Sequence, residues 1–221
     1  MTPHRKRIIA YVLGIITLGF LALTALVLLF PPSIVDREFS EEIQEHQNPG
    51  LDVLMKFISM FGYMPLSMCM VLATAALFYL FKFKKESLFV LFTLGSGAIS
   101  SGLKILIDRP RPTEDLVKII EKANHNSFPS GHTLFYVVFF GFVVLLMYHL
   151  KQINRQLRYM VIVFCFFLVF SVPLSRIYLG AHWFTDVLGG FLIGLLYLSF
   201  LIIMYLRKPK KTEQTAESVV Q

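Results

Sequence analysis

Long runs of apolar residues, separated by short polar segments, dominate the chain. Six runs stand out, at residues 8–30, 57–81, 87–107, 133–150, 159–174 and 183–206. A bilayer core about 30 Å thick requires about 20 residues of helix. Run 159–174 is short and needs its flanks or a locally thinner bilayer. The pattern predicts an all-α fold, a polytopic membrane bundle with six transmembrane helices.

The basic residues between the runs predict which side of the membrane each loop occupies. Thirteen of the 21 lie on one side, namely Arg5, Lys6, Arg7, Lys82, Lys84, Lys85, Lys151, Arg155, Arg158, Arg207, Lys208, Lys210 and Lys211. The positive-inside rule makes this side cytoplasmic and places both termini there. The opposite side begins with an acidic loop that contains Asp36, Glu38, Glu41, Glu42, Glu45 and Asp52 against Arg37.

Composition supports a membrane protein and one domain. Of the 221 residues, 56% are hydrophobic and only 16% are charged, too few for the surface of a water-soluble globule. The net charge of +7 does not indicate a nucleic-acid partner, because the basic residues punctuate apolar runs. We expect a six-span domain over 1–211, a disordered cytoplasmic tail over 212–221, and Cys69 and Cys165 as small core residues.

Segment 33–46 allows two interpretations. Val35, Phe39 and Ile43 recur every four residues between acidic positions, which is typical of an amphipathic helix lying on the outer surface. A solvated loop that ends at the turn 48–50 explains the segment equally well. Such a helix would border the entrance to an outer site.

Two pairs of small residues lie at helical spacing within the runs. Ala98 and Gly102, and likewise Gly190 and Gly194, are four residues apart. Small residues at this spacing let helices approach closely. We expect close packing within the bundle, and a monomer or weak homodimer.

Six basic residues fall on the outer side, where the topology rule disfavours them: Lys104, Arg109, Arg111, Lys118, Lys122 and Arg176. Lys118 and Lys122 are explained as solvated loop charges. Lys104 lies inside an apolar run near its outer end, and a charge in the membrane is costly and marks function. These positions focus attention on the outer ends of the spans.

Three motifs meet at these outer ends. They are Lys104 with Arg111-Pro112, the sequence Pro129-Ser130-Gly131-His132, and Ser175-Arg176 followed by His182 and Asp186. Together they span the signature region 104–186. The topology was predicted mostly from residues outside these motifs, so the meeting of the three motifs at one face is separate evidence for one site.

The chemistry of these residues is that of phosphoryl transfer. Lys104, Arg111 and Arg176 supply three cations, and guanidinium groups match phosphate oxygens in pairs. Ser130 and Gly131 open a helix whose N-terminal end favours an anion.

The histidines supply the reacting groups. His182 and Asp186 are four residues apart at a helix start and share a face. Asp186 can hold the Nδ1–H of His182 and leave Nε2 free as a nucleophile. His132 is then available as the acid–base residue.

The complete pattern resembles the signature of the type-2 phosphatidic acid phosphatase superfamily over residues 51–206. The layout is similar to bacterial phosphatidylglycerophosphate and undecaprenyl-diphosphate phosphatases of that superfamily. The resemblance implies a nucleophile at His182 that forms a phosphohistidine, an orienting carboxylate at Asp186 and an acid at His132. It implies a phosphate site made of Lys104, Arg111, Ser130, Gly131 and Arg176. Expected substrates are undecaprenyl diphosphate, phosphatidylglycerol phosphate or phosphatidate, hydrolysed at the outer face of a cell membrane. The compact loops favour a bacterial membrane.

Alternative functions use the same residues differently. A lipid phosphotransferase would pass phosphate from His182 to a second lipid. A carrier would place charges along a path near the membrane midplane, whereas here they gather at one face. No metal or other cofactor is expected, because Asp186 is needed by His182 and only Asp108 is added. His4, His46 and His149 are expected at the surface, and His125 to lie near the site.

Overall fold

The structure of the chain is a computed structural model that describes residues 3–30, 32–124 and 126–207. Nine helices and no strand occur in these residues: α1 (Pro3–Leu29), α2 (Ile34–Gln44), α3 (Pro49–Met60), α4 (Leu66–Leu80), α5 (Lys84–Phe92), α6 (Gly95–Ile107), α7 (Gly131–His149), α8 (Arg155–Tyr178) and α9 (Phe184–Leu206). The all-α class is confirmed. The predicted tail over 212–221 and His125 lie outside the described residues.

Five helical segments among the described residues are long and apolar enough to cross a membrane, with α5 and α6 forming one of them. The run 57–81 is the exception, because residues 61–65 interrupt it. Its longer part, α4, has 15 residues, about 22 Å of helix, and is too short to cross alone. Five of the six predicted spans are therefore found by length, and the sixth and the side of the termini remain predictions.

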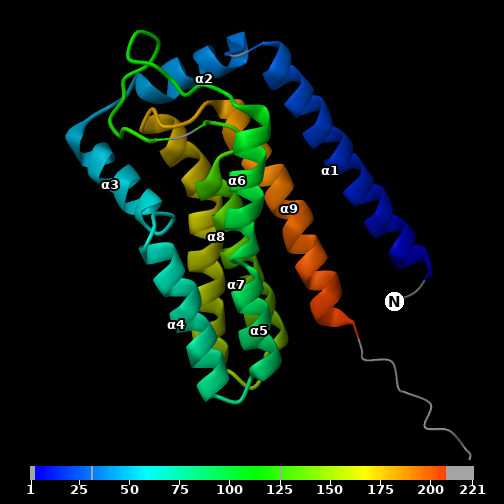
Figure 1. Cartoon of the computed structure of the whole chain (residues 1–221). Coiled ribbons are helices and arrows are strands. Elements are labelled where there is room, and N and C mark those ends of the chain that lie inside the picture. Colours follow the sequence, from blue (N-terminus) through cyan, green and yellow to red (C-terminus); the bar gives the residue numbers. More distant parts are fainter. Residues whose placement is uncertain (1–2, 31, 125, 208–221) are drawn as a thin grey trace, which may run out of the picture.

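Helix α7 forms the centre of the bundle. It packs against α8 and α9 along its length and against α6 (Figure 1). Glycines make the contact with α9 close, because a Cβ at Gly190 would lie 2.5 Å from the Ser130 carbonyl oxygen and one at Gly194 would lie 2.9 Å from Val137 Cβ. The predicted packing of Gly190 and Gly194 within the bundle is confirmed.

The other small pair does not pack in this way. Ala98 and Gly102 are exposed on α6, and a Cβ at Gly102 would meet no atom within 4 Å. The prediction of packing inside the bundle is wrong for this pair. The face of α6 that packs inward carries Ser96 and Ser100 instead.

Helix α2 lies across the end of the bundle where α6 ends and α9 begins (Figure 1). The helix interpretation of segment 33–46 is confirmed, and a capping box of Ser33 and Asp36 starts it. The buried face is not the apolar one: Asp36 and Ser40 are buried, whereas Val35 and Phe39 are each 44% exposed. The polar face of α2 packs on the protein.

The two cysteines differ in burial. Cys165 is buried in the core, as expected, but Cys69 is exposed on α4. The expectation for Cys69 is wrong because α4 turns Val71, Ala75 and Phe78 inward instead. His4, His46 and His149 are exposed, as predicted.

The close contact between α7 and α9 predicts that a leucine at Gly194 lowers the unfolding temperature more than a leucine at Gly14. Gly194→Leu should lower the unfolding temperature in detergent, because overpacking a fitted contact costs about 1–3 kcal/mol. Gly14→Leu on α1 is the control, since a Cβ at Gly14 meets no atom within 4 Å. Equal unfolding temperatures for the two variants would contradict the packing described.

Candidate active site

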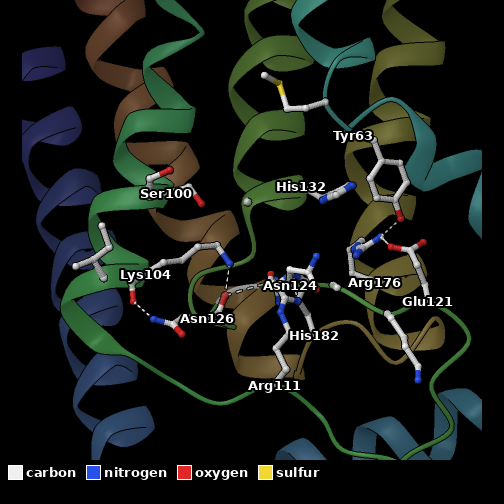
Figure 2. Close-up of a pocket in the computed structure, with 16 residues that line it drawn as sticks. Tyr63, Ser100, Lys104, Arg111, Glu121, Asn124, Asn126, His132, Arg176 and His182 are labelled. Carbon is white, nitrogen blue, oxygen red and sulfur yellow. Dashed lines mark hydrogen bonds and ion pairs between the residues drawn. The ribbon is translucent and has the colours of Figure 1, made fainter.

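A cavity of about 750 Å3 opens where α6 ends, α7 begins and α8 ends. Side chains from α6, α7, α8 and the segments that connect the helices point into it (Figure 2). Its lining consists of Tyr63, Met64, Ser100, Ser101, Lys104, Ile105, Arg111, Glu121, Lys122, Ala123, Asn124, Asn126, Gly131, His132, Arg176 and His182. Six of the eight residues assigned to the site by sequence therefore line one cavity.

Lys104 and Arg111 hold the loop between α6 and α7 against the site. Lys104 Nζ donates to the carbonyl oxygen of Asn126, whose side-chain amide donates back to the Lys104 carbonyl oxygen at 2.8 Å. Arg111 Nη1 donates to the carbonyl oxygen of Ala181 at 2.6 Å. Burial, with the nearby Arg176, lowers the pKa of Arg111 to about 10, so the guanidinium stays charged at neutral pH.

His182 lies between a carboxylate and an arginine. Its Nδ1 is 3.5 Å from Asp186 Oδ2 and 3.4 Å from Ser127 Oγ, and its Nε2 is 3.4 Å from Arg111 Nη1. A guanidinium can only donate, so Nε2 is the acceptor and the proton belongs on Nδ1. Burial, with Arg111, Arg176 and Lys104, holds the pKa of His182 well below its ordinary value. The imidazole is therefore neutral, with a lone pair on Nε2.

His132 occupies the first turn of α7 and packs against the loop 61–65. Its ring meets the Tyr63 ring edge-to-face, with centroids 4.5 Å apart. A Cβ at Gly62 would lie 2.3 Å from His132 Cδ2, so only glycine leaves room for the imidazole. Among the described residues no partner accepts from or donates to His132 Nε2, which is buried. The break between α3 and α4 thus places His132.

Arg176 is 1% exposed and is held by three acceptors. Its Nη1 donates to Tyr63 at 2.8 Å, to Glu121 at 3.0 Å and to Ser59 Oγ at 3.1 Å. Its Nε has no partner within the part of the chain that the structure describes. Sequence reasoning missed Tyr63 and Glu121; Gly62 and Pro65 in the run 57–81 were the available sign of a break there.

Ser130 and Asp186 lie behind the cavity instead of lining it. Ser130 is the N-cap residue of α7, but its hydroxyl accepts from Thr133 Oγ1 at 3.1 Å. Its backbone N–H donates to the Asp186 carbonyl oxygen at 2.9 Å. Gly131, by contrast, faces the cavity. Of the two small residues assigned to phosphate binding, only Gly131 is presented to a ligand.

Arg109 is the largest omission of the sequence analysis. It is 2% exposed, and Nη1 donates to Asp186 Oδ1 at 2.5 Å and to Thr185 Oγ1 at 2.7 Å. Its Nη2 donates to Asp36 Oδ2 at 2.6 Å. The sequence placed Arg109 on the outer side without a role. Its separation from Asp36 and Asp186 along the chain left no spacing signal.

The side chains that line the cavity are suited to bind an anion. Over the described residues, no group of three or more His, Cys, Asp or Glu side chains is arranged to share a metal ion. Lys118 and Lys122 are exposed, and Lys122 pairs with Glu114 at 3.3 Å, as expected of solvated charges. Lys104, Arg111 and Arg176 are the cations that remain at the cavity.

Comparison with known proteins identifies relatives of the chain. The profile of the PAP2 superfamily matches residues 85–210. Phosphatidylglycerophosphatase B of Bacillus subtilis (strain 168) is 29% identical over 199 residues, which cover 89% of this chain and 96% of the relative. The crystal structure of a transmembrane PAP2-type phosphatidylglycerolphosphate phosphatase from Bacillus subtilis matches with a TM-score of 0.78 at 25% identity, over 90% of this chain and 98% of that one. Aquifex aeolicus LpxE matches in fold, with a TM-score of 0.62 at 21% identity, over 79% and 98% of the two chains.

The contact of Gly62 with His132 can be tested by a substitution that adds one methyl group. Gly62→Ala should displace the imidazole and lower kcat on a phosphate ester by about 10- to 100-fold, because small misplacements of reacting groups cost this much. Gly97→Ala on α6 is the matched control, since a Cβ there meets no atom within 4 Å. Equal kcat values for the two variants would show that the position of His132 does not depend on Gly62.

Proposed function

The chain belongs to the PAP2 superfamily and is a lipid phosphatase, and we propose that it removes the terminal phosphate of a membrane lipid through a phosphohistidine on His182. The proposed reaction uses no metal and takes place at the outer face of the cell membrane. One observation carries the proposal: the unprotonated Nε2 of His182 lies 3.4 Å from Arg111 in a cavity that Lys104 and Arg176 also line.

The first step transfers the phosphoryl group to the enzyme. Phosphate oxygens bind to Lys104, Arg111 and Arg176, which offset their charge. His182 Nε2 forms a bond to phosphorus while the bond from phosphorus to the lipid oxygen breaks. Protonated His132 gives its proton to the leaving oxygen. The phosphorylated imidazole keeps its proton on Nδ1 and is a cation, which Asp186 stabilises.

The second step restores the enzyme. Neutral His132 takes a proton from a water molecule as the water oxygen bonds to phosphorus. The bond from phosphorus to His182 Nε2 breaks, and the electron pair returns to the nitrogen. Inorganic phosphate leaves, His182 is neutral again and His132 is protonated for the next turnover.

The surroundings of the cavity support a lipid substrate. Met64 and Ile105 belong to its lining, and both are exposed, Ile105 at 79% and Met64 at 67%. An apolar chain can lie against these side chains while its phosphate reaches the cations. The proposed substrates are phosphatidylglycerol phosphate, undecaprenyl diphosphate or phosphatidate. Similarity to phosphatidylglycerophosphatase B favours the first.

The histidine intermediate is tested by separating the two steps. His132→Ala should react slowly with a lipid phosphate but readily with p-nitrophenyl phosphate, because nitrophenolate leaves without a proton and general acid help is worth about 10²–10⁴-fold. One equivalent of nitrophenolate should appear as a burst, with excess chelator present, while phosphate accumulates on His182. The adduct should be acid-labile and base-stable.

Two variants serve as controls for this experiment. His132→Ala/His182→Ala should give no burst and no adduct. His149→Ala, which changes an exposed histidine on α7, should keep wild-type activity. A burst that persists without His182 would exclude that residue as the nucleophile.

The proposed side of the membrane is tested with single cysteines in a background of Cys69→Ser and Cys165→Ala. Glu42→Cys on α2 and Lys122→Cys beside the cavity change exposed residues, as does Gln152→Cys between α7 and α8. An impermeant thiol reagent added to intact cells should label the first two and not the third. The reverse pattern would place the cavity in the cytoplasm.

A further inference from the structure

Behind the nucleophile, four buried side chains form a continuous polar chain. His182 meets Asp186, Asp186 meets Arg109 at 2.5 Å, and Arg109 meets Asp36 at 2.6 Å. Asp36 and Asp186 are 0% exposed and Arg109 is 2% exposed. Two carboxylates and one guanidinium give this group a net charge of −1.

The second carboxylate changes the charge that His182 experiences. An isolated pair of Asp186 and Arg109 would be neutral, so the arginine would cancel the negative charge that a cationic imidazole needs. Asp36 takes up the other half of the guanidinium and restores one net negative charge. Buried charges at this range act strongly, because little water screens them.

The need for that charge arises from the phosphate site. Lys104, Arg111 and Arg176 bind the anion, but the same three cations oppose positive charge on His182. Once Nε2 bonds to phosphorus, the imidazole becomes a cation. A negative group on the Nδ1 side therefore favours the phosphorylated state.

Hydrogen bonds at both ends of helix α2 hold the negative charge of Asp36 beside Arg109. Asp36 Oδ1 accepts from the backbone N–H and hydroxyl of Thr185 at 2.9 and 2.8 Å, and Oδ2 accepts from the N–H and hydroxyl of Ser33 at 3.1 and 2.9 Å. At the other end of α2, Gln44 Nε2 donates to the carbonyl oxygens of Lys118 and Tyr178 at 2.8 and 3.0 Å. Both ends of the helix are thus fixed to segments of the site.

We propose that Asp36 and Arg109 are positioning residues that hold Asp186 and set a net charge of −1 behind His182, so that the surface helix α2 favours formation of the phosphohistidine. This inference rests on the proposed function. It assigns a role in the reaction to a carboxylate of the first outer segment.

The two half-reactions distinguish this role from a structural one. In the His132→Ala background, Asp36→Asn should slow the nitrophenolate burst on the order of tenfold or more, because one buried charge is lost. The trapped phosphohistidine should decay faster, since its cation is less stabilised. Simple damage to the fold would slow both steps, and that result would overturn the proposal.

A second variant restores the charge by another route. Asp36→Asn/Arg109→Gln removes one negative and one positive charge and leaves the net charge of −1 on Asp186. With His132 intact, kcat on a lipid phosphate should fall in Asp36→Asn and recover by about tenfold in the double variant, with little change in KM. The Trp183 N–H and the Ser127 hydroxyl still hold Asp186 without Arg109, so a double variant that folds but is no faster than Asp36→Asn would contradict the charge argument.

Matched controls distinguish failure of the proposed phosphohistidine reaction from failure of the role given to Asp36 and Arg109. Glu38→Gln removes a negative charge from an exposed position on the same helix and should leave both half-reactions unchanged. Folding of each variant is checked by its unfolding temperature in detergent. If His132→Ala traps no phosphohistidine, the proposed function fails; if the adduct forms but Asp36→Asn does not hasten its decay, only the role of Asp36 and Arg109 fails.

Discussion

The site depends on one buried carboxylate, that of Asp186. It receives the N–H of Trp183 at 2.9 Å, the hydroxyl of Ser127 and the guanidinium of Arg109, while it faces Nδ1 of His182. The first bond starts α9, and the others fix the loop that follows α6. A buried anion is tolerated only when such donors replace its water. The interactions that allow Asp186 to be buried therefore also orient His182, the proposed nucleophile.

The packing of α9 against α7 also holds Asp186 and His182 in place. Gly190 and Gly194 bring α9 so close to α7 that the Ser130 N–H donates to the Asp186 carbonyl oxygen. Because this bond joins the first turns of both helices, Gly131 and His132 keep a fixed position relative to His182. Residues at a close-packed contact resist small shifts, and phosphoryl transfer needs that rigidity.

Irregular backbone completes the site where a continuous span was expected. The interruption at residues 61–65 brings Gly62 against His132 and Tyr63 against Arg176. Non-helical backbone within a membrane protein is acceptable when it lines a polar cavity. The buried face of α2 is also polar, with Asp36 and Ser40. The interruption lines the cavity, and the buried face of α2 meets Arg109 through Asp36.

The sequence by itself determined the all-α class, five of the six predicted spans by length and six of the residues that line the cavity. Apolar runs predicted the helices because bilayer thickness sets their length, and the motifs around Lys104, His132 and His182 have local spacing that chemistry can interpret. Only the tertiary structure decided what holds these groups. Asp36, Arg109 and Asp186 are far apart along the chain, and nothing in their spacing predicts an ion pair. The stripe of Val35, Phe39 and Ile43 predicted the helix, but the buried face of α2 is set by Asp36, whose partners Arg109 and Thr185 come from distant segments. Contacts between distant segments arise from packing, and a single sequence carries no local signal for them.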